Sequence, residues 1–86
     1  MNVHIPTPLR SYTRKESVIE AGGGTVGEML AEIERRYPGF RFRIIDEQDA
    51  IREHIKIFIN GKPVNSLSAP LQAGDTIHIM CALSGG

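Results

Sequence analysis

The residue types that most often carry out catalysis are sparse in this chain and far apart in its sequence. There is one cysteine, Cys81, and there are three histidines, His4, His54 and His78, among 86 residues. Such separation indicates isolated histidines at solvated or interfacial positions rather than a metal site. His78 and Cys81 are three residues apart on a predicted strand, so their side chains should point to opposite faces. No nucleophile–base set can be assembled from these residues, and we predict that the chain is not an enzyme.

Cys81 shares its predicted strand face with Ile77 and Ile79. We therefore expect a small buried hydrophobe, with a reactive thiol as the alternative. A single cysteine excludes an internal disulfide and cannot supply the four thiolates of an iron–sulfur cluster. A reducing, cytoplasmic setting fits this cysteine usage best.

The segment from Gly22 to Gly27 matches G-x-G-x-x-G between a predicted strand and a predicted helix, and Glu47 follows at the spacing of an acidic ribose ligand. A dinucleotide site needs a parallel, doubly wound sheet, which a chain of this length with a hairpin at its front cannot build. A turn that leads into a capped helix explains the glycines, so we expect no stably bound cofactor.

Length and charge narrow the class of protein further. Eighty-six residues make one domain, and ten basic against ten acidic residues give a formal net charge of zero. This balance argues against nucleic-acid partners and against a polybasic membrane anchor. No basic region followed by an apolar run opens the chain, and no stretch approaches ~18 apolar residues, so we expect neither export nor membrane spanning.

Periodicity predicts a hairpin at the front of the fold. Val3 and Ile5 lie on one face of a short first strand, and residues 16–20 form a second strand after a polar turn at residues 9–15.

A helix should follow, because Thr25 and Glu28 form a capping box in which each side chain accepts from the other's backbone N–H. The helix begins at Val26 and ends before Pro38-Gly39. Its apolar stripe consists of Val26, Met29, Leu30, Ile33 and Tyr37. Residues 40–53 are expected to be mostly irregular.

The second half of the chain supplies three more predicted strands. Residues 54–59 form one, Asn60-Gly61 is a turn pair that tolerates positive φ, and residues 62–64 return as an edge strand. Gly74-Asp75 introduces the last strand, residues 76–83. This order predicts an α+β fold, a mixed sheet of four to five strands with one main helix on one face, as in the β-grasp arrangement.

Strand phase predicts a partly apolar outer face on this sheet. If Ile55, Ile57 and Ile59 point toward the core, the residues between them point outward. The first and last strands are central neighbours in a β-grasp sheet, so outward residues of three strands should be contiguous. We call this set the sheet-face patch and predict that it binds a partner protein; it consists of His4, Lys56, Phe58, His78 and Met80.

The chain ends on Ala82-Leu83-Ser84-Gly85-Gly86, where a strand runs directly into a diglycine. Residues 84–86 should project as a flexible tail from a domain of residues 1–83. A glycine tail alone does not identify a class of protein. Combined with the order of strands and helix described above, it becomes a specific signal.

With these elements in place, the sequence resembles the ubiquitin-like sulfur-carrier proteins of the MoaD/ThiS family over essentially its whole length. The terminal diglycine is the most diagnostic motif, and the opening segment is most similar to the cysteine-synthesis carriers. Cys81 departs from the proline or other small residue that many relatives carry. The supporting segments are residues 5–10, 25–30, 36–39, 57–61, 74–77 and 85–86.

The resemblance implies that an E1-like adenylyltransferase and sulfurtransferase adenylates the Gly86 carboxylate with ATP, which that partner consumes. Sulfur then displaces AMP and leaves a thiocarboxylate. Gly85 and Gly86 would be the carrier residues, with Leu83 and Ser84 entering the partner's cleft beside them. A sulfur-accepting synthase would be the downstream partner, and a metalloprotease that trims the tail is a further one.

Three functions stay open at this point. A sulfur carrier for the biosynthesis of cysteine, molybdopterin, thiamine or a related product predicts a mass increase at the C-terminus. A protein modifier predicts an isopeptide bond from Gly86 to a lysine of another protein. A non-catalytic interaction module predicts neither.

Overall fold

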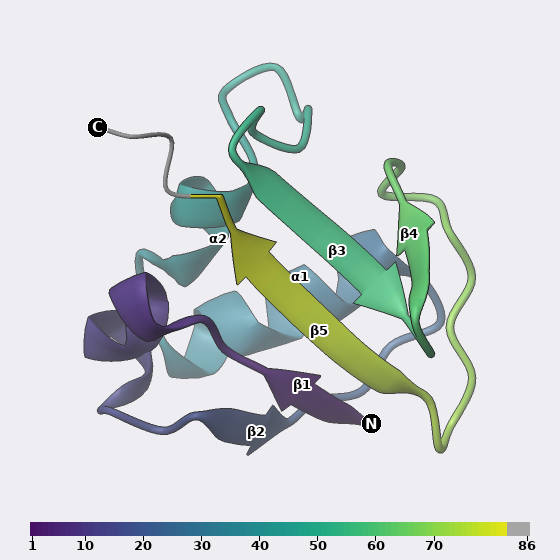
Figure 1. Ribbon diagram of the computed structural model, residues 1–86, viewed down its shortest axis with the longest axis horizontal. Helices are drawn as coiled ribbons and strands as arrows, with labels where there is room; N and C mark the ends of the chain where they lie inside the picture. The colour runs from purple at the N-terminus through teal and green to yellow at the C-terminus, as the bar shows by residue number, and fades with distance from the viewer. Residues whose placement is uncertain (83–86) are drawn as a thin grey trace.

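A computed structural model describes residues 1–82 as a five-stranded mixed sheet with helices against one face (Figure 1). The strands are β1 (Asn2–His4), β2 (Val18–Glu20), β3 (Ile55–Ile59), β4 (Lys62–Val64) and β5 (Thr76–Cys81). The helices are a 3-10 helix, η1 (Thr7–Thr13), and two α-helices, α1 (Val26–Arg36) and α2 (Phe40–Ile44). The predicted α+β class and the β-grasp arrangement are confirmed.

β5 occupies the centre of the sheet, whose strand order is β2-β1-β5-β3-β4. β1 pairs in parallel with β5 and antiparallel with β2. β3 pairs antiparallel with both β5 and β4. The first and last strands are therefore central neighbours, as predicted, and β4 is an edge strand, where Pro63 leaves no internal hydrogen bond unmade.

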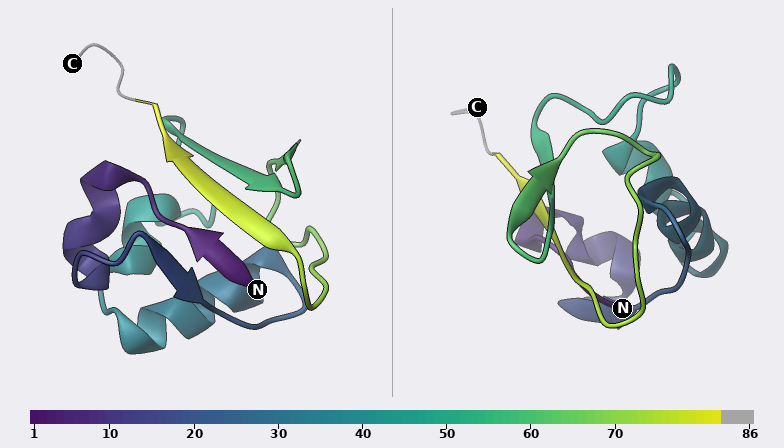
Figure 2. Two further views of the ribbon diagram at one scale, coloured as in Figure 1. Left: turned by 60° about the horizontal axis from the view of Figure 1, so that its bottom comes forward. Right: turned by 90° about the vertical axis from the view of Figure 1, so that its right-hand side faces the viewer.

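The core lies between the sheet and α1, and no helix of residues 1–82 lies against the opposite sheet face (Figure 2). The predicted strand phase is confirmed, because the inward residues of β1, β3 and β5 are almost fully buried, apart from the half-buried Ile59 and Cys81 at the strand ends. They meet the apolar stripe of α1, in which only Tyr37, beyond the end of the helix, stays partly exposed. Fully buried members of this core include Val3, Ile57, Ile77, Met29, Leu30, Ile33 and Phe40.

Two side chains cap the N-terminus of α1, but they do not form the reciprocal capping box that the sequence predicts. Thr25 Oγ1 accepts from the backbone N–H of Glu28 at 3.2 Å, as expected. Glu28 Oε1 accepts from the N–H of Gly24 at 2.8 Å, one residue before Thr25. Gly23 (φ +135°) approaches the helix so closely that a Cβ there would lie 2.8 Å from Met29 N. Gly23 is thus required by this close approach.

Of two predictions about irregular segments, the first is wrong and the second fails only for residues 40–44, because residues 45–53 form no helix or strand. The expected turn at residues 9–15 is mostly η1, which buries Leu9 and Thr13. The expected irregular stretch begins with α2, which places Phe40 and Ile44 four residues apart on one buried face and leaves Phe42 51% exposed. Tertiary burial of that face decides the conformation of so short a segment.

β5 ends at Cys81, two residues earlier than the predicted strand. The predicted tail, residues 84–86, and the last predicted strand residue, Leu83, lie outside the described residues. Within residues 1–82, no helix has the length and apolar character that crossing a membrane requires.

Candidate partner-binding face

The five residues of the sheet-face patch lie on adjacent strands in direct register. Lys56 of β3 is paired with Met80 of β5, and Phe58 with His78. His4 of β1 is paired with the same His78. The structure therefore brings the predicted set together on the sheet face opposite α1.

The patch exposes apolar surface between half-buried rings. Met80 is 51% exposed, and Lys56 is exposed beside it. His4, Phe58 and His78 are half-buried, so Phe58 is not a core residue. A methionine and an aromatic ring accessible on one flat face are typical of a protein-binding surface.

His4 and His78 form a stacked pair, with ring centroids 4.2 Å apart and planes inclined by 10°. These two histidines are far apart in the sequence, but the parallel register of β1 and β5 places them side by side, as the predicted sheet-face patch requires. His54, just before β3, is exposed and separate from the stack. Among residues 1–82, no group of three or more His, Cys, Asp or Glu side chains is arranged to hold a metal ion.

A hollow of about 440 Å³ adjoins the patch where β1 leads into η1 beside β5. Cys81 lines it and packs at the same time against the core, so the expected fully buried thiol is half-buried instead. Arg10 lines its wall, held there by donation from Nε to the Ile5 carbonyl at 3.0 Å. Sequence periodicity did not indicate this hollow, because η1 was not predicted.

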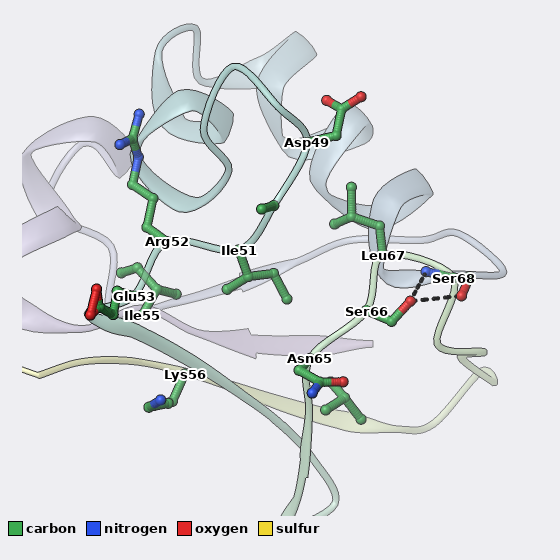
Figure 3. Close-up of a pocket in the computed structure, with 12 residues that line it drawn as sticks. Asp49, Ile51, Arg52, Glu53, Ile55, Lys56, Asn65, Ser66, Leu67 and Ser68 are labelled. Carbon is green, nitrogen blue, oxygen red and sulfur yellow. Dashed lines mark hydrogen bonds between the residues drawn. The ribbon is translucent and has the colours of Figure 1, made fainter.

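A larger open cavity of about 640 Å³ lies between the loop before β3 and the segment after β4. Ile51 and Leu67 approach it from its two walls, and Ser66 is hydrogen-bonded to Ser68 at its rim (Figure 3). The guanidinium of Arg52 turns away, over the exposed ring of Phe42 at 4.6 Å. No signal in the sequence distinguished this cavity from an ordinary loop.

The start of β5 is fixed by a hydrogen-bonded cluster at the β3–β4 turn. Asp75 accepts from Gln72 N at 2.8 Å and from Asn60 Nδ2 at 2.9 Å, while Asn60 Oδ1 accepts from Thr76 N at 2.9 Å. These donors lower the pKa of the Asp75 carboxyl below its ordinary value. The cluster thus sets where β5 enters the sheet.

The end of β5 is fixed from β3, because Ala82 N donates to the His54 carbonyl at 2.7 Å. Four predicted site residues follow this point and lie outside the described residues: Leu83, Ser84, Gly85 and Gly86. The structure therefore describes the sheet-face patch and the chain as far as Ala82, the residue before Leu83.

The mixed sheet with a central last strand and one long helix is the ubiquitin-like β-grasp fold. The chain belongs to the ThiS family, whose family model matches residues 3–86. This confirms the resemblance to the ubiquitin-like sulfur-carrier proteins.

Two known sulfur-carrier chains are similar over essentially the whole chain, and a small archaeal modifier protein is similar over part of it. Sulfur carrier protein CysO of Mycobacterium tuberculosis is 30% identical, covering 100% of this chain and 98% of its own. The crystal structure of the BexX/CysO complex of Amycolatopsis orientalis contains a chain with a TM-score of 0.92 and 35% identity, covering 99% of this chain and 98% of that one. Small archaeal modifier protein 3 of Haloferax volcanii is 28% identical over 72% of this chain and 70% of its own.

Proposed function

We propose that this chain is a sulfur carrier whose Gly86 carboxylate is adenylated by an E1-like partner and then converted to a thiocarboxylate. The observation that carries the proposal is the family match over residues 3–86, which includes the diglycine. The full-length similarity to sulfur carrier protein CysO supports the same chemistry.

The reaction needs activation because a carboxylate is a poor electrophile. Attack of a Gly86 oxygen on the α-phosphorus of ATP forms an acyl adenylate and releases pyrophosphate. A sulfur nucleophile then attacks the acyl carbon, so that a C–S bond forms and the C–O bond to AMP breaks. The partner supplies ATP and sulfur, while the carrier contributes only its terminal carbonyl group and no catalytic side chain.

The composition of the chain end suits entry into a narrow cleft. Leu83 to Gly86 can span at most ~13 Å when extended, enough to reach a buried nucleotide while the domain stays outside. Glycine has no Cβ, so the backbone can approach the nucleotide closely. From Thr76 to Gly85 there is no Lys, Arg, Asp or Glu, which limits the desolvation cost of insertion.

The sheet-face patch is the proposed docking surface for the body of the carrier. It lies on the strand that leads to the tail, and the exposed Met80 and half-buried Phe58 provide apolar contact area. Similarity to a chain crystallised in a BexX/CysO complex supports docking to a second protein, which we propose is a sulfur-accepting synthase. We further propose that a metalloprotease trims the C-terminal tail and that the protein acts in the cytoplasm.

A protein modifier is the second candidate, favoured by the 28% identity to small archaeal modifier protein 3. In that case Gly86 would form an isopeptide bond with a lysine of another protein after the same activation.

Intact-mass analysis separates these functions. The chain is incubated with its activating enzyme, ATP and a sulfur donor, and a carrier gains the mass difference between one sulfur and one oxygen atom. A modifier forms higher-mass conjugates in cell extract instead. The control is a variant that lacks Gly86, which should fold normally and support no ATP–pyrophosphate exchange. Undiminished exchange with that variant, or an unchanged mass of the intact chain, would contradict the proposal.

A further inference from the structure

Four exposed basic side chains gather where η1, the end of α1 and α2 meet, and we call them the basic corner: Arg14, Lys15, Arg36 and Arg43. The guanidinium groups of Arg14 and Arg36 each lie 5.6 Å from the ring centroid of Tyr37. The guanidinium group of Arg43 lies 5.7 Å from the ring centroid of Tyr12.

The rings of Tyr12 and Tyr37 belong to one surface. Gly39 follows Tyr37 by two residues, and a Cβ on Gly39 would lie 3.5 Å from Tyr12 Cε1. The Tyr12 ring therefore covers the backbone that leads from Tyr37 into α2, and the cations on the two rings are neighbours.

Within residues 1–82, none of the four side chains of the basic corner forms a salt bridge. Arg36 donates to the backbone carbonyl of Glu20, not to its carboxylate. Glu34 accepts instead from the backbone N–H groups of Gly39 at 2.9 Å and Arg41 at 2.8 Å. Glu16, which follows Lys15 in the sequence, is exposed, and within residues 1–82 it forms no salt bridge either. A chain of zero net charge thus concentrates cations at one corner.

The backbone that presents two of these cations is strained. Arg14 (φ 53°) and Lys15 (φ 69°) are consecutive left-handed residues in a turn closed by donation from Glu16 N to Thr13 O at 2.9 Å. The β3–β4 turn has the same signs of φ but uses Asn60 and Gly61, the residues that tolerate them best. Strain kept at side chains that contact solvent is typical of a functional surface.

The basic corner lies toward the end of the sheet where β5 finishes, since η1 and α2 are both placed there (Figures 1 and 2). A protein that takes up residues after Ala82 must approach this end of the molecule. The same protein could therefore contact the sheet-face patch and the basic corner together.

We propose that the basic corner binds an acidic surface of the protein partner that receives the C-terminus. The proposal relies on the proposed function for the identity of that partner. Arginine suits this role because its planar fork pairs with two carboxylate oxygens at once. Cation–π contact with Tyr12 and Tyr37 restricts the guanidinium groups before binding, which lowers the entropy lost on association.

The first test measures adenylation kinetics with the activating enzyme and the full chain. The double substitution Arg14→Glu with Arg43→Glu should raise KM for the carrier about tenfold and leave kcat unchanged, with the effect reduced at high salt. Lys62→Glu, on the edge strand β4, is the matched control and should leave KM unchanged. An unchanged KM in the double variant, or an equal rise in the control, would overturn the proposal.

The second test uses the strained turn. Arg14→Asn with Lys15→Gly should raise Tm by about 4 °C or more, because the new residues accept positive φ, while KM rises. If the turn belongs to a functional surface, the variant should gain stability and lose affinity for the partner. A variant that gains stability and binds as well as the original chain contradicts it.

A third measurement does not depend on adenylation. If the wild-type chain is not adenylated at all, the proposed function fails, and the basic corner is tested by NMR titration with a decaglutamate peptide. We expect shift changes centred on Tyr12, Tyr37 and their arginines, and their loss in the double Glu variant. The absence of such changes, or tighter binding of an RNA oligonucleotide than of the peptide, would overturn an acidic protein as the partner.

Discussion

The imidazole rings of His4 and His78 stack across the boundary between the first and last strands, with centroids 4.2 Å apart. Each ring is anchored by its own strand, and the two residues are direct partners in the parallel pairing of β1 with β5. Phe58 is the antiparallel partner of His78 on the other side. Three rings from three strands therefore form a row across the outer sheet face.

The stack should contribute to stability beyond the two single side chains. We expect His4→Ala and His78→Ala to be non-additive, with a coupling energy of about 0.5–1.5 kcal/mol in the free energy of unfolding. Urea unfolding of both single variants and the double variant measures this quantity. Pairing His54→Ala with His78→Ala is the control and should give additive changes, and strict additivity for His4 with His78 would show that the rings do not interact.

Phe58→Ala should weaken binding to the activating enzyme by more than ~1 kcal/mol while the domain stays folded. The reason is that Phe58 is half-buried on the outer face, not in the core. Phe40, which is fully buried, is the matched control, and Phe40→Ala should cost about 3–5 kcal/mol of stability. Both quantities are measured on both variants by calorimetric titration and thermal unfolding. Equal destabilisation by the two substitutions would place Phe58 in the core.

Leu30→Ala and Ile33→Ala should each lower the free energy of unfolding by about 2–5 kcal/mol, because both side chains are completely buried between α1 and the sheet. Arg35→Ala, on the exposed side of the same helix, should change it by less than about 0.5 kcal/mol. Denaturant unfolding followed by circular dichroism makes the comparison. Similar midpoints for all three variants would mean that the core is misplaced.

Asp75 should make part of the stability depend on pH. Hydrogen bonds from Gln72 N and Asn60 Nδ2 lower its pKa in the folded state, so its stabilising effect is complete above the ordinary value of 3.8 and is lost as pH falls through the lower, folded value. The stability difference between the wild type and Asp75→Asn should therefore shrink on acidification below that point. Unfolding curves over this range test the sign. Asp46→Asn is a second case in which the same trend is expected, because donation from Ala50 N and Gln48 N also lowers the pKa of Asp46. A difference that does not vary with pH would contradict the assignment.

The elements that sequence patterns predicted best are those with a long period or a specific turn. α1 combines a capping residue, an apolar stripe and a Pro-Gly stop, and its bounds agree with all three. The β3–β4 hairpin follows from Asn60-Gly61, both of which adopt positive φ. Strand phase alone predicted which residues form the sheet-face patch, because side chains alternate along a strand and the buried set determines the outward set.

The elements that escaped prediction depend on contacts between distant segments. The five residues of α2 are too few for a helical period to be recognised, and their alternating apolar residues fit a strand as well. The stacking of His4 on His78 depends on register between strands at opposite ends of the described chain. The basic corner likewise arises only when η1 is placed beside α2, and no local motif connects Tyr12 with Arg43.

The central position of β5 also determines how the molecule can be assembled. Without residues 76–81, β1 with β2 and β3 with β4 are two separate hairpins that share no hydrogen bond. On a ribosome, the sheet can therefore close only after the last strand has emerged from the exit tunnel. Pairing between residues so distant in sequence is slow to form, and we expect the nascent chain to keep its hairpins unjoined until then.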